Sequence, residues 1–78
     1  MNDTYKYYFK VGNVIVHGGI TNNLVRREIE HRNSGKWSLY NGGRLYWKNG
    51  HILQVGRKTT RQAALRWERE NGYGANQN

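Results

Sequence analysis

The sequence predicts an α/β domain of the α+β type, in which a small and mainly antiparallel sheet is flanked by helices. Two segments rich in aromatic and β-branched residues are each divided by an Asn/Gly pair, which is typical of β-hairpins. Two other segments combine polar N-caps with helical spacing. A chain of 78 residues buries one modest core, so we expect a single domain over residues 1–78.

The first hairpin is expected within Tyr5–Val16, with Gly12-Asn13 as its two-residue turn. This turn pairs Tyr8 with His17, and strand alternation then sorts the side chains onto two faces. The face expected to form the core holds Tyr7, Phe9, Val11, Val14 and Val16. The polar face, expected to carry function, holds Lys6, Tyr8, Lys10, Ile15 and His17.

The first helix is expected over Leu24–His31, after an N-cap within Thr21-Asn22-Asn23 and before a stop at residues 33–35. Val25 and Ile29 lie one turn apart, and we expect them to anchor the buried stripe. Arg27 and His31 are also four residues apart and share a different face.

The middle of the chain, residues 36–43, has no clear period and is expected to be a loop lying on the core. Residues 44–48 and 51–55 flank Asn49-Gly50, which predicts a second hairpin. Trp37, Tyr46 and Trp47 are interpreted as core residues, because a small domain needs large side chains inside.

A final helix is expected over residues 60–71. Thr59 and Gln62 have the spacing of a capping box, and Gly72 suits the C-terminal cap. The polar tail, residues 73–78, is expected to be frayed.

Charge is the strongest compositional observation. Thirteen Lys and Arg residues against five Asp and Glu give a net charge of +8, with basic residues from Lys6 to Arg69. Such a protein attracts polyanions, so we expect DNA as its partner, with RNA as the alternative. If it makes about 6 phosphate contacts, log affinity should fall with log salt at a slope of about −5. The charges of Lys6, Lys10 and Arg44 are expected to contact the nucleic-acid backbone.

Other classes are disfavoured by the composition. The chain has no cysteine, which excludes disulfides and thiolate zinc sites. No apolar run approaches the length of a membrane span, and the first residues lack the pattern of a signal peptide. We therefore expect a cytoplasmic protein without a membrane partner.

Polar and aromatic residues of the first hairpin, the first helix and the last helix follow a defined spacing. The set comprises Tyr7, Tyr8, Phe9, His17, Gly19, Arg27, His31, Ala64, Leu65 and Glu68. In this order the chain resembles the GIY-YIG nuclease family. Arg27 follows His17 by ten residues, as the family arginine follows its second tyrosine, and Gly19 matches the glycine of "YIG". His17 stands where the family has that second tyrosine, and the first strand lacks the Gly-Ile pair.

The resemblance implies a metal-dependent endonuclease that hydrolyses DNA and leaves a 5′ phosphate and a 3′ hydroxyl. It implies that Glu68 binds Mg²⁺ or Mn²⁺ and that Arg27 and His31 hold the phosphate. The first tyrosine is assigned to Tyr8 by the expected register, with Tyr7 as the alternative if the register shifts. Without a separate recognition domain the resemblance implies low sequence specificity, with targeting left to a homodimer or another partner.

The chemistry of these residue types fits phosphodiester hydrolysis independently of the resemblance. The planar guanidinium of Arg27 binds two phosphate oxygens and stays charged. Glu68 offers a carboxylate to a hard ion that keeps most of its waters. His17 or Tyr8 is the candidate base, and the ordinary pKa of histidine, near 6.5, suits neutral pH better than that of tyrosine.

The carboxylates limit the possible metal chemistry. They are Asp3, Glu28, Glu30, Glu68 and Glu70. Asp3 lies near the terminus, Glu28 can pair with Arg32, and Glu70 can pair with Arg66. A two-metal site built on several carboxylates is therefore disfavoured, and a one-metal site with one carboxylate fits the inventory.

Two alternatives remain open. The first is a non-catalytic nucleic-acid-binding domain that keeps the GIY-YIG-like fold, which the replacement by His17 favours. The second is a small basic RNA-binding protein in which aromatic residues around Tyr46-Trp47 stack on bases.

Overall fold

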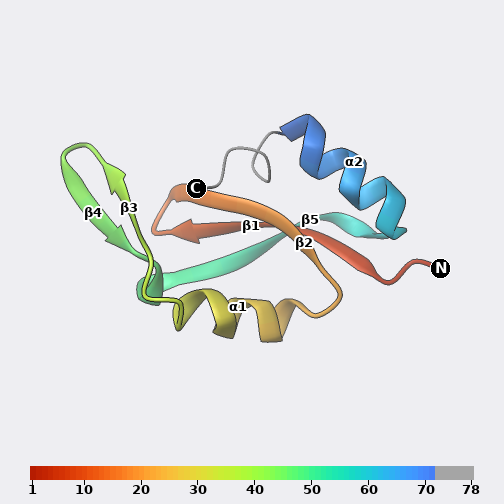
Figure 1. Cartoon of the computed structure of the whole chain (residues 1–78), viewed down its shortest axis with the longest axis horizontal. Helices are drawn as coiled ribbons and strands as arrows, with labels where there is room; N and C mark the ends of the chain where they lie inside the picture. Colours follow the sequence, from red (N-terminus) through yellow and green to blue (C-terminus); the bar gives the residue numbers. More distant parts are fainter. Residues whose placement is uncertain (72–78) are drawn as a thin grey trace.

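The computed structural model describes residues 1–71. It contains five strands in antiparallel sheets and two α-helices, which confirms the predicted fold class. The elements are β1 (Thr4–Val11), β2 (Val14–Thr21), α1 (Leu24–Arg32), β3 (Trp37–Tyr40), β4 (Gly43–Tyr46), a 3₁₀ turn η1 (Trp47–Asn49), β5 (Gly50–Thr59) and α2 (Arg61–Asn71). The main sheet has the order β2-β1-β5, with α1 on one side and α2 on the other (Figure 1).

The first hairpin forms as expected, but the predicted register was wrong beyond its first two pairs. Val11 pairs with Val14 and Lys10 with Ile15; Phe9 then pairs with His17, which leaves Val16 as an additional residue in β2. A bulge of this kind moves all later side chains to the other face of the strand. His17 therefore joins the face that carries Tyr7 and Phe9, and Tyr8 lies opposite Gly18.

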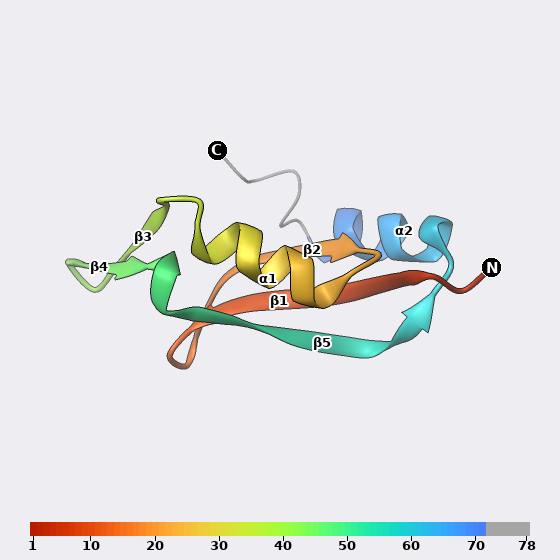
Figure 2. The ribbon, with the colours of Figure 1, turned by 90° about the horizontal axis from the view of Figure 1, so that it is seen from below.

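The second hairpin predicted around Asn49-Gly50 was also wrong. β5 instead pairs antiparallel with β1 and places β1 in the centre of the sheet (Figure 2). Gly50 is buried and packs closely against Phe9: a Cβ at this position would lie 2.5 Å from the Phe9 ring. This glycine allows two strands to approach closely and does not form a turn.

A hairpin forms instead in the segment that was expected to be a loop. β3 and β4 pair through Trp37–Tyr46 at one end and Tyr40–Gly43 at the other. The turn residues Asn41 and Gly42 have φ values of 51° and 78°, the positive values required at both positions of a type I′ turn. This two-stranded hairpin extends away from the main sheet (Figure 1).

Helix α1 buries a different face from the one predicted. Its N-cap is Asn23, whose side chain accepts a hydrogen bond from the Arg26 amide at 3.0 Å. Val25 and Ile29 are 73% and 54% exposed, so they do not anchor the buried stripe. The inward stripe consists of Leu24, Arg27, Glu28 and His31, at the spacing i, i+3, i+4, i+7. Glu28 and His31 occupy this stripe because Ile52 of β5 and Tyr7 of β1 offer them hydrogen-bond partners.

The Glu28 carboxylate accepts a hydrogen bond from the Ile52 amide at 2.9 Å, and this bond connects α1 to β5. Glu28 was expected to pair with Arg32, but the structure directs its carboxylate to Ile52, and Arg32 Nε donates to the Lys48 carbonyl. A charged acceptor on a backbone amide is a strong form of hydrogen bond.

Helix α2 starts one residue later than expected. Thr60 is the cap, and its hydroxyl accepts a hydrogen bond from the Ala63 amide at 3.2 Å, while Thr59 ends β5. Ala64 is fully buried against the sheet. The expected cap at Gly72 and the tail at 73–78 lie outside the described residues.

The main core lies between the sheet and α1. Its buried members are Tyr7, Phe9, Val11 and Trp47, with Val16, Leu24, Leu45 and Ile52 packed against them. Trp47 is therefore a core residue as predicted, but Trp37 and Tyr46 are 46% and 42% exposed and are not. In the described part of the chain no helix has the length and apolar character needed to cross a membrane.

Candidate active site

Tyr7 and His31 form the centre of the candidate site. The Tyr7 hydroxyl lies 2.7 Å from His31 Nε2, and both side chains are buried. Burial raises the pKa of Tyr7 to about 12, with the Glu68 and Glu30 carboxylates adding to the rise and Arg27 opposing it. Burial, together with the nearby charges of His17, Arg27 and Lys36, lowers the pKa of His31 from 6.5 to about 4. At neutral pH both groups are therefore uncharged, and they share this hydrogen bond.

His17 completes a cluster of three rings. Its ring centroid lies 4.9 Å from that of His31 and 5.9 Å from that of Tyr7. Gly19 makes this arrangement possible. A Cβ at Gly19 would lie 2.9 Å from the Tyr7 hydroxyl oxygen and 3.3 Å from His17 Nε2. Because no side chain occupies that position, two groups that can exchange protons converge on one point of the backbone.

Arg27 brings a permanent positive charge to the cluster. It lies one helical turn before His31 on the inward stripe of α1, and its Nη1 lies 3.2 Å from a Glu30 carboxylate oxygen. Its Nε is buried and has no hydrogen-bond partner among residues 1–71. A buried donor without a partner is costly, and a phosphate oxygen can satisfy it.

Glu68 approaches from the far end of the chain. Its half-buried carboxylate lies near enough to Tyr7 to raise the pKa of the phenol. Within the described residues no group of three or more His, Asp or Glu side chains could hold a metal ion. One carboxylate still suits Mg²⁺, which commonly takes one or two protein carboxylates and completes its shell with waters and substrate phosphate oxygens.

The structure brings His17, Arg27 and His31 together, and the Glu68 carboxylate lies close enough to act on the same cluster. The tyrosine that joins them is Tyr7, and not Tyr8 as expected. Tyr8 lies on the other face of β1, where its ring centroid is 5.8 Å from that of Trp67 in α2. The assignment to Tyr8 depended on the predicted register, and the bulge at Val16 removes its basis.

Trp47 is a site residue that the sequence analysis did not identify. Its ring centroid lies 5.5 Å from that of His17 and 5.3 Å from that of His31, so it forms one wall of the cluster. Its Nε1 donates to Ser38 Oγ of β3 at 2.9 Å. Trp47 thus joins the β3–β4 hairpin directly to the candidate site.

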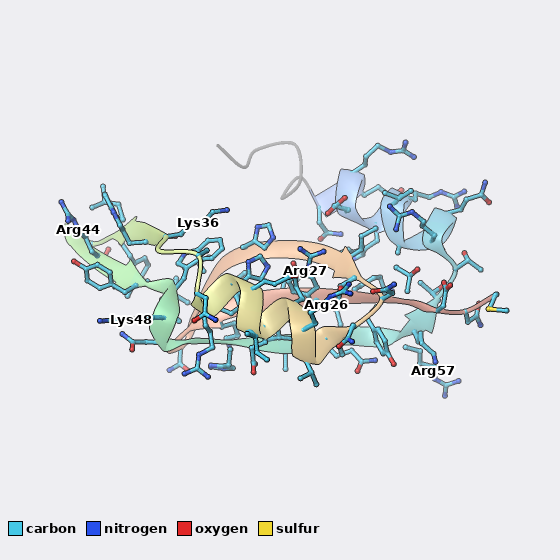
Figure 3. All side chains as sticks on the ribbon, turned by 60° about the horizontal axis from the view of Figure 1, so that its bottom comes forward. Arg26, Arg27, Lys36, Arg44, Lys48 and Arg57 are labelled. Atoms are coloured by element: carbon cyan, nitrogen blue, oxygen red, sulfur yellow. The ribbon has the colours of Figure 1, made fainter. Side chains whose placement is uncertain are left out.

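The expected nucleic-acid contacts do not all lie on one face. Lys6 and Lys10 alternate with Tyr7 and Phe9 along β1, so they lie on the α2 side, away from Arg27. Arg44 lies on the β3–β4 hairpin. The face that carries Arg27 displays further cations that the sequence analysis did not select: Arg26, Lys36, Lys48 and Arg57 (Figure 3). They come from four separate elements or loops, which is why the sequence alone did not group them.

The chain matches no protein-family model, no curated protein and no solved structure.

Proposed function

We propose that this protein is a metal-dependent endonuclease that hydrolyses DNA phosphodiester bonds at the cluster of Tyr7, His17, Arg27 and His31, with Glu68 as the metal-binding residue. The observation that carries the proposal is the convergence of these side chains from β1, β2 and α1, with Gly19 leaving room for two of them. The resemblance to GIY-YIG nucleases assigns His17, Arg27, His31 and Glu68 to the same site, and Tyr7, the alternative to Tyr8, takes the place of the first tyrosine.

Arg27 binds the scissile phosphate. Its buried Nε has no protein acceptor among the described residues, and a phosphate oxygen supplies one. Binding of this anion also reduces the net positive charge beside His31.

His17 takes the proton from the attacking water. With the His31 proton on Nδ1, the Tyr7 hydroxyl donates to Nε2, and the Tyr7 oxygen accepts a hydrogen bond from that water and orients it. His17 Nε2 faces the same point of the backbone and receives the proton. The water oxygen forms a bond to phosphorus, the bond from phosphorus to the 3′ oxygen breaks, and the 3′ oxygen takes a proton from solvent.

Glu68 would hold Mg²⁺ or Mn²⁺, and such an ion supplies charge neutralisation on the phosphate when it is bound. A single carboxylate is sufficient because the ion keeps most of its waters. His31 was expected to hold the phosphate, but it is buried with its Nε2 on the Tyr7 hydroxyl, so its role in this mechanism is to position Tyr7.

Cleavage of supercoiled plasmid with Mg²⁺ or Mn²⁺ tests the proposal. Glu68→Gln should abolish nicking, whereas Glu70→Gln, on the exposed side of the same helix, should retain it. Arg27→Ala should also abolish nicking. Its control is Arg61→Ala, which should retain nicking, because Arg61 is exposed at the start of α2 and lies outside the cluster.

DNA binding without cleavage, with both metals and with linear and branched DNA, would contradict the proposal. The result would favour the non-catalytic binding domain. The replacement of the second tyrosine by His17 would then explain the loss of chemistry, and His17→Tyr would be the variant in which to look for recovered cleavage.

A further inference from the structure

We infer that the outer face of the β3–β4 hairpin binds unpaired nucleotides next to the candidate active site, so that DNA containing single-stranded nucleotides is the preferred substrate class. The preferred substrate class rests on the proposed function, because it assumes that the protein cuts DNA. Binding of unpaired nucleotides by the hairpin does not rest on it, because binding can be measured without metal.

The hairpin has one face toward the protein and one toward solvent. Residues paired across two strands point to the same side. Ser38 and Leu45 form one such pair, and they face the protein: Ser38 accepts the Trp47 hydrogen bond and Leu45 packs against the core. The flanking pairs, Trp37 with Tyr46 and Leu39 with Arg44, therefore form the outer face.

This outer face combines exposed aromatic rings with cations. Trp37 is 46% exposed and Tyr46 42% exposed, and they lie directly opposite each other. The Arg44 guanidinium carbon lies 4.3 Å from the centroid of the Trp37 ring, and Lys48 Nζ lies 5.9 Å from that of Tyr46. A small domain that exposes large rings loses the stabilisation of burying them, so their exposure indicates a binding role.

The charge of the surrounding chain identifies the partner as a polyanion. Residues 31–67 contain no Asp or Glu, although they include Lys36, Arg44, Lys48 and Arg57. Figure 3 shows the labelled cations distributed from the hairpin, through α1, to the end of β5. An apolar protein partner gives no reason for a segment that carries cations and no carboxylate, whereas a nucleic-acid backbone does.

Aromatic rings beside the cations favour unpaired bases over an intact duplex. In a duplex the bases are already stacked on each other, and their faces cannot contact Trp37 or Tyr46. Single-stranded bases stack on exposed aromatic side chains while cations contact the backbone. The two pairs of the outer face lie two residues apart along the strand, roughly 7 Å, which accommodates one or two nucleotides.

The hairpin also lies in the right place to direct this strand to the candidate active site. The Trp47 amide donates to the Lys36 carbonyl at 3.0 Å, and the Trp47 indole contacts both histidines of the cluster. The hairpin base and the ring cluster are therefore packed against the same side chain. Figure 3 shows Lys36 between the hairpin and Arg27, so a strand that runs from Trp37 and Tyr46 to Arg27 would pass this cation.

Fluorescence anisotropy in EDTA tests this inference with labelled oligo(dT) of about 12 nucleotides and a duplex of similar length. Trp37→Ala should weaken single-strand binding about 5- to 100-fold, and Tyr46→Ala should act in the same direction. Trp37→Phe keeps a stacking ring and should bind within about 3-fold of the wild type. Tyr40→Ala is the matched control, because Tyr40 is 48% exposed on the opposite face of the hairpin.

Equal binding of oligo(dT) by Trp37→Ala and the wild type would overturn the inference, as would an equal loss with Tyr40→Ala. An equal loss on the duplex and the single strand would also overturn it, since that result indicates backbone contact and not stacking. Far-UV circular dichroism and thermal melting establish that each variant is folded. A protein that fails to cut DNA but shows the Trp37 effect would contradict the proposed function alone.

Discussion

Acid should destabilise this protein through His31. The imidazole is buried against Tyr7, His17 and Trp47, and its pKa is lowered from 6.5 to about 4. In the unfolded chain the same group titrates near 6.5. Between these pH values the unfolded state binds a proton that the folded state does not, so stability rises with pH across this range.

The size of the effect follows from the two pKa values. They differ by about 2.5, and each pKa unit corresponds to about 1.4 kcal/mol, so the contribution is about 3 kcal/mol. It should be fully present above pH 6.5 and should be lost as the pH falls to about 4. A chain of this length has a total stability of roughly 4–12 kcal/mol, so this loss is a large part of it.

Urea denaturation at several pH values between 4 and 7.5 measures this contribution. His31→Gln should reduce stability at neutral pH and should remove most of the dependence on pH over this range. His51→Gln is the control, because His51 is exposed and outside the cluster. If the wild type and His31→Gln lose stability in parallel as the pH falls, His31 is not buried as a neutral group and the argument fails.

Three further changes test individual contacts. Gly19→Ala places a methyl group 2.9 Å from the Tyr7 hydroxyl, so it should lower the free energy of unfolding by about 1–3 kcal/mol in urea denaturation and abolish plasmid nicking. Nicking at the wild-type rate would contradict the close approach. Glu28→Ala leaves the Ile52 amide without its acceptor and should lower the free energy of unfolding by about 1–3 kcal/mol. Glu30→Ala, on the exposed side of α1, should change it by less than about 1 kcal/mol, and equal losses in the two variants would contradict the role of Glu28. Tyr7→Phe should reduce the nicking rate at least about 10-fold and Tyr8→Phe should not, and the reverse order would restore the register predicted from the sequence.

The sequence alone predicted the first hairpin and both helices, and it grouped His17, Arg27 and His31, but it placed Tyr8 with them where the structure has Tyr7. Turn residues at Gly12-Asn13 and caps near Asn23 and Thr60 act locally, so they can be recognised without knowledge of the fold. His17, Arg27 and His31, which were grouped by their spacing in the sequence, also lie together in the structure, because the periodicity of a strand and of a helix decides which residues share a face. The presence of Asn41-Gly42 between two aromatic segments was a further local signal, and it identifies the hairpin that was expected to be a loop.

The tertiary structure decided which tyrosine joins the site and which face of α1 is buried. A single additional residue at Val16 reverses the face of the strand, and no local preference in the sequence specifies it. Val25 and Ile29 gave the apolar pattern of a buried stripe, but Glu28 and His31 find hydrogen-bond partners in Ile52 and Tyr7. Those partners lie 24 residues away in each case, so the polar stripe became favourable only when the distant strands were in place.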